Sequence, residues 1–454
     1  MASGTTTATR CRRHPNISVM LLLISIMARR PALGEEGGNA GAAAFTDERH
    51  HHHVSFSERS GDTPGTVWTA ANSHDDDGIL MVGTLRQRYV SQHHDDVVPR
   101  HVAFEAQQNI IDSSSTATYI GAAGAVNAHV DGHRLTAARL HGPTGLTFLP
   151  SKRLMFADWS GGYLRVLEAD GTVSTVAGSG AAGGADSTGL AAQVDGPTAL
   201  VYNPSENRVY FVSSYAVRHV TASAPYVVTT FAGSVLTAGA PVDAAVGTAI
   251  RFQGVWGLAF SLNYEYLFVA DRNANKVLRI TMSSAALLNI AGDGTGAFLD
   301  AGTATAGRFN NPRAIAMTAH GELAVADETN NRIRLVTLST TSSLTTLACD
   351  GTTSGSLSGR TYAVYCTGPL GIASMPSVGN TTLIYFGAAN GPIRRIEFGS
   401  VFLVTTSSGS VNDAAYALAF DTVNSPVYGG FSPAYAYQHT LYFSELYNNR
   451  IAAS

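Results

Sequence analysis

Polar side chains recur at a regular spacing along the last three quarters of the chain, and their types could bind a ligand or a metal ion. One set of six lies two residues before the start of each repeated segment, namely His141, Asp195, Gln253, Asn310, Thr367 and Asp413. Imidazole, carboxylate, amide and hydroxyl groups on one face would form a polar funnel for a small ligand or a peptide. Because side chains of this kind also hold loop backbones in place, a purely structural role is the alternative.

A second set ends the second predicted strand of each repeat. Its members are Asp158, Ser213, Asp271, Asp327, Gly387 and Glu445, at steps of 55, 58, 56, 60 and 58 residues. Arginines lie on or beside the strand that follows, among them Arg165, Arg218, Arg279, Arg332, Arg334 and Arg450. We interpret both groups as structural positions, at which arginines bond between repeats and pair with the carboxylates. A patch that binds carboxylate ligands is the alternative.

Convergent carboxylates would also suit a calcium-dependent hydrolase. The candidates are Asp195 and Asp413, together with Asp158 or Glu445. The sequence has nothing that resembles a nucleophile elbow, a P-loop or a dinucleotide-binding fingerprint. We therefore predict no catalytic residue, no metal ligand and no cofactor, with bound calcium as the alternative.

Six copies of one unit position these groups. The fourth copy reads FNNPRAIAMTAHGELAVADETNNRIRLV, from Phe309 to Val336, and the third reads GVWGLAFSLNYEYLFVADRNANKVLRI, from Gly254 to Ile280. Each unit has room for four short strands, with Gly and Pro at the turns. Continuous apolar segments such as LFVA predict strands that are buried on both faces. A single unit cannot bury both faces, so the units must close on each other.

These units resemble NHL repeats, whose signature combines Pro-x-Gly-Ile, Tyr-Val-Ala-Asp and Asn-Asn-Arg-Ile. The resemblance covers about residues 116–454 and implies an all-β, six-bladed β-propeller of four-stranded blades. It is weaker where Ser213 and Gly387 replace the aspartate and where Pro392 replaces the arginine. Some NHL-like propellers resemble the amidating lyase of peptide processing, which holds its metal with histidines. Of the histidines in the repeat region, only His141 belongs to the set of six residues that precede the repeats, so a three-histidine site is poorly supported.

The two ends of the repeat region are predicted to meet. The last unit lacks a fourth strand, and residues 116–121 supply one, because Ile120 precedes Ala177 by one unit of 57 residues. We expect this strand to complete blade six and to remove an exposed sheet edge. The long connections, such as 178–196 and 292–311, share one rim with the loops after the second strands. That rim is the expected binding face.

The N-terminal part of the chain is different. Basic residues precede a 12-residue apolar run from Ile17 to Ala28, which is typical of a secretory signal and short for a membrane span. We predict a signal peptide over residues 1–34, with an uncleaved signal anchor as the alternative. Residues 35–115 contain His and Asp clusters without an apolar period, so we expect a flexible low-complexity region.

Export would affect three further residues. In an oxidising compartment Cys349 and Cys366 would form a disulfide, with two unpaired thiols as the alternative. Asn380 begins the sequence Asn-Thr-Thr and would carry a glycan.

Composition narrows the class of partner. The net charge is −4 and charged residues make up only 14% of the chain, which argues against nucleic-acid binding, a property of some cytoplasmic NHL domains. We expect a monomeric, non-enzymatic propeller that binds a protein, peptide or glycan ligand in the secretory pathway or at the cell surface. It would reach the membrane only through an uncleaved anchor. The alternative is a metal-dependent propeller lyase or hydrolase with a site at the central pore.

Overall fold

The computed structural model describes most of the repeat region and five strands nearer the N-terminus. In the repeat region the described residues are 117–121, 128–352, 359–361, 363–376, 382–389, 393–397, 400–403, 415–420, 441–445 and 449–453. The chain separates into two compact units, Met1–Ile110 and Ile111–Ser454. Asn380, Pro392 and Asp413 lie outside the described residues.

The N-terminal unit contains one antiparallel sheet whose strands follow chain order. They are β1 (Ala43–Asp47), β2 (His52–Arg59), β3 (Val67–Ser73), β4 (Val82–Gln87) and β5 (Phe104–Asn109). The sheet falls within residues 35–115, where the sequence indicated no regular element. The flexibility expected of the rest of that region stays a prediction, and residues 1–34 lie outside the described part. None of the helices in the described segments has the length and apolarity that crossing a membrane requires.

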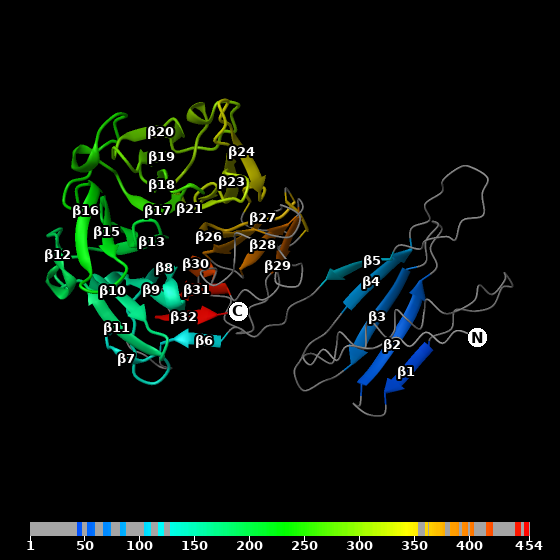
Figure 1. The fold of residues 1–454 in the computed structure, drawn as a ribbon. Helices are drawn as coiled ribbons and strands as arrows, with labels where there is room; N and C mark the ends of the chain where they lie inside the picture. Colours follow the sequence, from blue (N-terminus) through cyan, green and yellow to red (C-terminus); the bar gives the residue numbers. More distant parts are fainter. Residues whose placement is uncertain are drawn as a thin grey trace, which may run out of the picture. The chain divides into compact units, whose positions relative to one another are not determined.

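The second unit is a six-bladed β-propeller, as the repeat predicts (Figure 1). Four strands make each blade, from the innermost to the outermost. Blades one to three are β8 (Pro143–Leu149), β9 (Arg153–Asp158), β10 (Tyr163–Leu167) and β11 (Thr172–Ala177); β13 (Pro197–Asn203), β14 (Arg208–Ser213), β15 (Ala216–Thr221) and β16 (Val227–Gly233); and β17 (Val255–Phe260), β18 (Tyr266–Asp271), β19 (Lys276–Thr281) and β20 (Leu287–Ala291). Blades four to six are β21 (Pro312–Met317), β22 (Leu323–Asp327), β23 (Arg332–Val336) and β24 (Leu344–Ala348); β26 (Pro369–Pro376), β27 (Thr382–Ala388), β28 (Arg394–Glu397) and β29 (Ser400–Leu403); and β30 (Ala415–Phe420), β31 (Leu441–Glu445), β32 (Arg450–Ala453) and β6 (Ala117–Ile120).

Short additional elements decorate the blades. Two-residue strands pair with the outer strands of blades one, two and five, namely β7 (Gly132–His133), β12 (Ser187–Thr188) and β25 (Gly359–Arg360). Single 3₁₀ turns occur at η1 (Pro150–Lys152), η2 (Trp159–Gly161), η3 (Gly189–Ala191), η4 (Gly247–Ala249) and η5 (Ala304–Ala306).

Apolar contacts between neighbouring blades close the ring. The inner strand of every blade contacts the inner strands of both neighbours, including β30 against β8. A buried apolar cluster lies between each pair of blades in the described residues. The cluster between blades six and one contains Ile120, Phe156, Tyr442 and Ile451. Both faces of each middle strand are therefore buried, which explains why these strands are apolar throughout.

Strand β6 forms the outer edge of blade six. It pairs antiparallel with β32, with Ile120 opposite Ile451 and Ala117 opposite Ala453. Arg450 joins the two, because it pairs with the Glu445 carboxylate and its Nη1 donates to Thr118 Oγ1 at 3.2 Å. Blade six thus combines strands from opposite ends of the repeat region.

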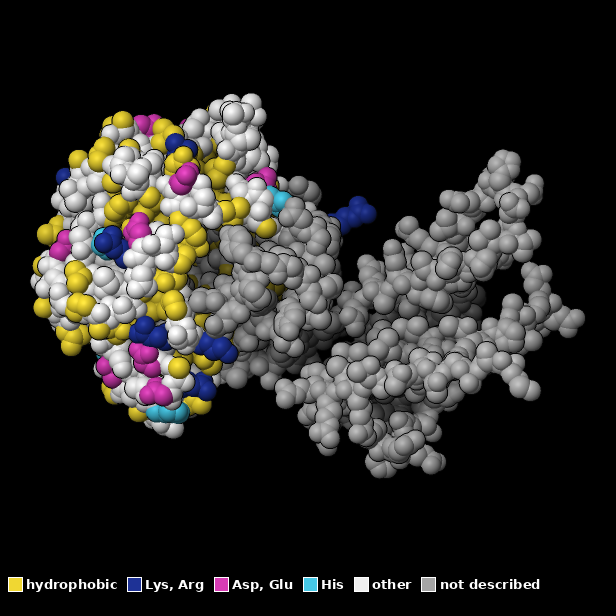
Figure 2. Space-filling model, viewed as in Figure 1, with side chains coloured by type: hydrophobic (Ala, Val, Ile, Leu, Met, Phe, Trp, Pro, Cys, Tyr) yellow, Lys and Arg dark blue, Asp and Glu magenta, His cyan; other side chains and the backbone are white. Residues whose placement is uncertain are grey.

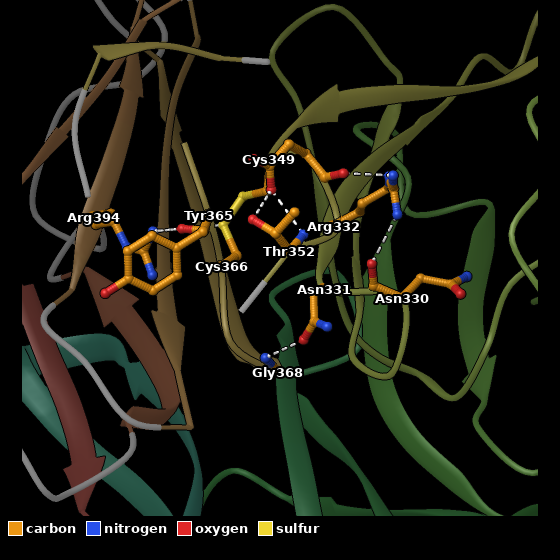
Figure 3. Close-up of a disulfide and its surroundings, with 10 residues drawn as sticks. Asn330, Asn331, Arg332, Cys349, Thr352, Tyr365, Cys366, Gly368 and Arg394 are labelled. Carbon is orange, nitrogen blue, oxygen red and sulfur yellow. Dashed lines mark hydrogen bonds between the residues drawn. A yellow bond between two sulfur atoms is a disulfide. The ribbon is translucent and has the colours of Figure 1, made fainter. Parts of the chain in front are cut away.

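A repeated asparagine links each of three blades to the next. Asn331 lies in the left-handed region at a φ of 53°, and its Oδ1 accepts a hydrogen bond from Gly368 N at 2.8 Å (Figure 3). Asn275 in blade three binds Asn311 N in the same way at 2.9 Å. Asn449 Oδ1 accepts from Gly142 N at 2.9 Å, so blade six is joined to blade one by the same contact.

The structure joins Cys349 and Cys366 in a disulfide between blades four and five (Figure 3). Their Cα atoms are 5.7 Å apart and both residues are buried. Cys349 occupies the position that Gly292 holds one blade earlier, and both residues have positive φ. Gly292 packs against Phe309, so the disulfide replaces a glycine–phenylalanine contact of the neighbouring blade.

The pairing of β6 with β32 predicts that Ile120→Ala destabilises the propeller. Ile120 is fully buried, so the substitution leaves a cavity and should lower the free energy of unfolding by about 2–4 kcal/mol. Chemical denaturation would measure this, with the exposed Leu236→Ala as the control, since it should change stability by less than about 0.5 kcal/mol. Equal effects of the two substitutions would contradict the place of β6 in blade six.

Candidate ligand-binding face

In blades one to four the residue at the end of the second strand binds the backbone where a long loop enters the inner strand. In blade one Asp158 Oδ1 accepts a hydrogen bond from His141 N at 2.7 Å, and in blade four Asp327 Oδ1 accepts from Asn310 N at 2.8 Å. Both aspartates are fully buried. A carboxylate that accepts backbone N–H groups in this way fixes the start of the inner strand.

Strand pairing corrects the sequence assignment in blade five. The first residue of each inner strand pairs with the last residue of the second strand, as Pro312 does with Asp327. In blade five Pro369 pairs with Ala388, so Ala388 and not Gly387 is the equivalent of the aspartate. The local sequence FGAA has no carboxylate to set the register, which is why spacing alone misplaced it by one residue.

A buried arginine in blade four holds the incoming long loop. Arg334 Nη1 donates to the Arg308 carbonyl at 3.0 Å and to Asp327 Oδ2 at 2.7 Å. Its Nη2 donates to the Leu299 carbonyl at 3.0 Å and to Asp300 Oδ1 at 2.6 Å. A single guanidinium therefore binds the second-strand carboxylate and two points on the loop, and we call this arrangement the arginine latch.

The full arginine latch recurs in blade one, and blades two and five contain parts of it. Arg165 binds the carbonyls of Arg139 and Val130 and the carboxylates of Asp158 and Asp131, while Arg218 binds the carbonyls of Gln193 and Ala185 and the carboxylate of Asp186. Arg394 binds the Tyr365 carbonyl in blade five (Figure 3). All four guanidiniums are buried. These arginines act within a blade and its own loop, whereas the sequence analysis expected bonds between repeats.

Sequence reasoning missed the loop aspartates of the latch. Asp131, Asp186 and Asp300 each also accept from a threonine of the outer strand, as Asp186 does from Thr230 N and Oγ1 at 2.9 Å. With Asp243 they recur at steps of 55, 57 and 57 residues, which matches the repeat. The signal was present, but these aspartates lie in connections whose other residues differ from blade to blade.

Blade three lacks the latch. Leu278 stands opposite Val269, the place that Arg334 takes opposite Val325 in blade four. Asp271 therefore accepts only backbone N–H groups, from Gln253 at 3.0 Å and Gly254 at 2.8 Å. Burial raises the pKa of Asp271 to about 6. Asp243 still accepts from Asn289 N at 2.6 Å, so the contact between the loop aspartate and the outer strand remains.

The structure describes five of the six residues of the predicted polar funnel. His141, Asp195, Gln253, Asn310 and Thr367 are all half-buried at the entrances to inner strands, and none lines the central cavity among the described residues. Asp195 turns to its own blade, because its Oδ2 accepts from Ser214 Oγ at 2.8 Å. A ligand-binding role for these residues stays a prediction, and so does that of Asp413.

The central cavity is formed by the inner strands instead. It has a volume of about 1040 Å³ and is lined by β8, β13, β17, β21, β26 and β30. Its wall is mostly apolar, with residues such as Leu200, Leu258, Ile315 and Ile372. Arg313 is the charged residue in the described lining.

Arg313 lies near the rim at which the long loops meet. Its guanidinium carbon is 4.2 Å from the Trp256 ring centre and 4.6 Å from that of Tyr416, two rings that come from blades three and six. Arg313 Nη1 donates to Glu328 Oε1 at 3.3 Å, and Arg272 Nε donates to Glu328 Oε2 at 2.9 Å. Burial lowers the pKa of Arg313, and Glu328 opposes that shift. One carboxylate is thus shared between two guanidiniums.

Two histidines and a buried aspartate lie close together beside blade one. His129 and His141 lie with ring centres 5.3 Å apart, and His129 Nδ1 is 3.0 Å from Asp158 Oδ2. Among the described residues no three His, Cys, Asp or Glu side chains are grouped to hold a metal ion. The calcium and lyase alternatives stay predictions without an observation that favours them.

Asp327 pairs with a buried guanidinium, whereas Asp271 does not. Replacing each carboxylate by an amide should therefore change the stability of the protein by different amounts. Asp327→Asn leaves Arg334 without its buried carboxylate partner and should lower the free energy of unfolding by about 3 kcal/mol. Asp271→Asn removes no ion pair and should change it by about 1 kcal/mol or less at pH 7. Calorimetric or denaturant unfolding of both variants would measure the difference, and equal losses would contradict the latch.

Asp271 also predicts a dependence on pH. Its folded pKa, about 6, lies above the ordinary value of 3.8, so its contribution to stability is complete below pH 3.8 and is lost as the pH rises through 6. Asp271→Asn should therefore gain stability relative to the natural protein between pH 4 and pH 7. An unchanged difference across that range would contradict the raised pKa.

Comparisons with known proteins agree with this fold. The chain is 29% identical over 231 residues to Teneurin-4 of Homo sapiens and to Teneurin-4 of Mus musculus, and each match covers 45% of this chain but 8% of Teneurin-4. A structural genomics protein of unknown function from Bacteroides thetaiotaomicron superposes with a TM-score of 0.53 at 12% identity, over 90% of this chain and 89% of that one. An auxiliary nutrient binding protein from Bacteroides ovatus has a TM-score of 0.53 at 8% identity, over 88% and 93%. These structural likenesses show the fold alone.

A family model provides the closer assignment. The model of the Teneurin NHL domain matches residues 80–337, which is more than half of the 454 residues. The match begins before the first blade and ends within blade four. The chain therefore belongs to the Teneurin NHL domain family.

Proposed function

We propose that this propeller is a binding module that presents its long-loop rim to a protein or peptide partner in the secretory pathway or at the cell surface. The observation that carries the proposal is the set of arginine latches. They hold long, irregular loops on one rim in a fixed conformation, and a pre-ordered loop surface binds without a large loss of conformational entropy.

The surface chemistry of that rim supports a protein or peptide partner. Trp159 follows the second strand of blade one and is 42% exposed, and Phe298 lies 44% exposed in the long loop before blade four. Exposed aromatic side chains of this kind anchor protein interfaces. On the face that Figure 2 draws, acidic and basic side chains of the described residues are interspersed with apolar ones.

The secretory setting rests on two observations. The apolar run from Ile17 to Ala28 has the pattern of a signal sequence. The disulfide between Cys349 and Cys366 suits an oxidising compartment, where such bonds persist.

A glycan placed on each rim tests the proposal. Ala185→Asn creates Asn-Asp-Ser in an exposed part of the long loop before blade two, and Ser339→Asn creates Asn-Thr-Thr in an exposed turn on the opposite rim. Each variant would be secreted from cultured animal cells, checked for glycan addition and thermal stability, and then measured for binding to a panel of cell lines by flow cytometry.

The expected result separates the two rims. The glycan at position 185 should abolish binding, because it covers the long-loop rim, whereas the glycan at position 339 should leave binding intact. Binding that survives at 185 and is lost at 339 would place the partner on the short-turn rim. A natural protein that binds none of the cell lines would also contradict the proposal.

A further inference from the structure

Among the described residues of the propeller, the charges around Arg313 do not balance. Arg272 and Arg313 together carry two positive charges, and Glu328 carries one negative charge. Arg313 is 8% exposed, and in the described part of the chain Glu328 is the one side chain that accepts a hydrogen bond from it. A guanidinium has five N–H groups, so most donors of Arg313 have no protein acceptor there.

Two aromatic rings lie against Arg313. Its guanidinium carbon is 4.2 Å from the ring centre of Trp256 and 4.6 Å from that of Tyr416. Rings in cation–π contact do not accept the N–H groups in conventional hydrogen bonds, so these groups remain available to acceptors in the cavity. The Arg313–Glu328 hydrogen bond is 3.3 Å long, which is at the weak end for a charge-assisted bond.

The wall of the cavity beyond Arg313 is mostly apolar. The cavity therefore combines a surplus positive charge with an apolar wall.

From this geometry we infer that the long-loop end of the central cavity binds a carboxylate of a peptide, with Arg313 and Arg272 as the binding residues. The ligand carboxylate takes the place of Glu328 on the two guanidiniums, so Glu328 is an internal competitor. The apolar wall formed by Leu258, Ile315 and their neighbours accepts the apolar side chain beside that carboxylate. The inference rests on the proposed function, because it assigns part of the partner's recognition to this cavity.

The apolar wall favours a peptide over an acidic sugar. A sugar ring would require several hydrogen-bond donors and acceptors below the carboxylate, whereas most residues of the cavity wall are apolar, with leucine, isoleucine, alanine and phenylalanine side chains. A peptide that ends in leucine offers one carboxylate and one apolar side chain, which matches the two parts of the cavity.

Titration with a defined peptide tests the inference. The probe is acetyl-Gly-Ser-Leu with a free carboxylate, compared with the same peptide as a C-terminal amide. Trp256 fluorescence reports binding through its contact with Arg313, and Trp256→Phe shows whether the signal comes from this residue. The free acid should bind at least about 10-fold more tightly than the amide, since charge-assisted hydrogen bonds are lost with the carboxylate.

Three variants separate the roles of Arg313 and Glu328 in binding of the free acid. Arg313→Gln should weaken binding of the free acid by about 10-fold or more, and Arg313→Lys should weaken it less. Glu328→Gln should strengthen binding, because it removes the internal competitor. Arg208→Gln is the matched control, because Arg208 is an exposed arginine on the short-turn rim that also pairs with a glutamate, and binding should not change. Thermal unfolding of each variant would verify its fold.

Several results would overturn the inference. These are equal binding of acid and amide, unchanged binding in Arg313→Gln, or weaker binding in Glu328→Gln. Arg313-dependent binding of free sialic acid without binding of the peptide would assign the anion to a glycan instead. If cells still bind Arg313→Gln while the glycan at position 185 blocks them, the cavity inference fails and the proposed function stands.

Discussion

The long loops have irregular backbone, and their buried carbonyl groups need hydrogen-bond donors. In this propeller buried arginines supply those donors. Each latch guanidinium binds one or two carbonyl groups of a long loop, and in blades one, two and four it also binds a loop aspartate that in turn holds the outer strand. Without these donors the buried carbonyls would be unsatisfied, at a cost of about 1–3 kcal/mol each. The shape of the long-loop rim therefore depends on side chains that lie inside the blades.

The contacts that close the ring of blades differ from those that hold the long loops in place. Closure comes from apolar clusters between blades, from the Asn449–Gly142 contact and from the pairing of β6 with β32. The apolar clusters recur between all neighbouring blades in the described residues, and the asparagine contact recurs at three of these junctions. The rim differs from blade to blade, because Leu278 removes the latch in blade three and a disulfide replaces the glycine–phenylalanine contact before blade five. Differences of this kind are what a scaffold needs to distinguish one partner from another.

The repeat could be predicted from sequence because apolar strands and turn residues recur at one spacing. That spacing predicts six blades and places Asp158, Asp271 and Asp327 at equivalent positions. It fails where no polar residue marks the register, so Ala388 was missed in favour of Gly387. The functional surface is harder to predict, since Arg313, Trp256 and Tyr416 come from three blades and occupy one position of the repeat with three different residue types. Periodicity identifies positions at which the repeats carry similar residues, whereas the residues of this cluster differ from blade to blade.

Hydrogen exchange of the long loops tests the latch most directly, because blade three provides an internal control. Loops 178–196 and 292–311 are latched by Arg218 and Arg334, whereas loop 234–254 enters the blade that has Leu278. The latch predicts slow exchange of backbone amides in the first two loops and faster exchange in the third. Equal protection of all three loops, or rapid exchange in the two latched ones, would contradict the account.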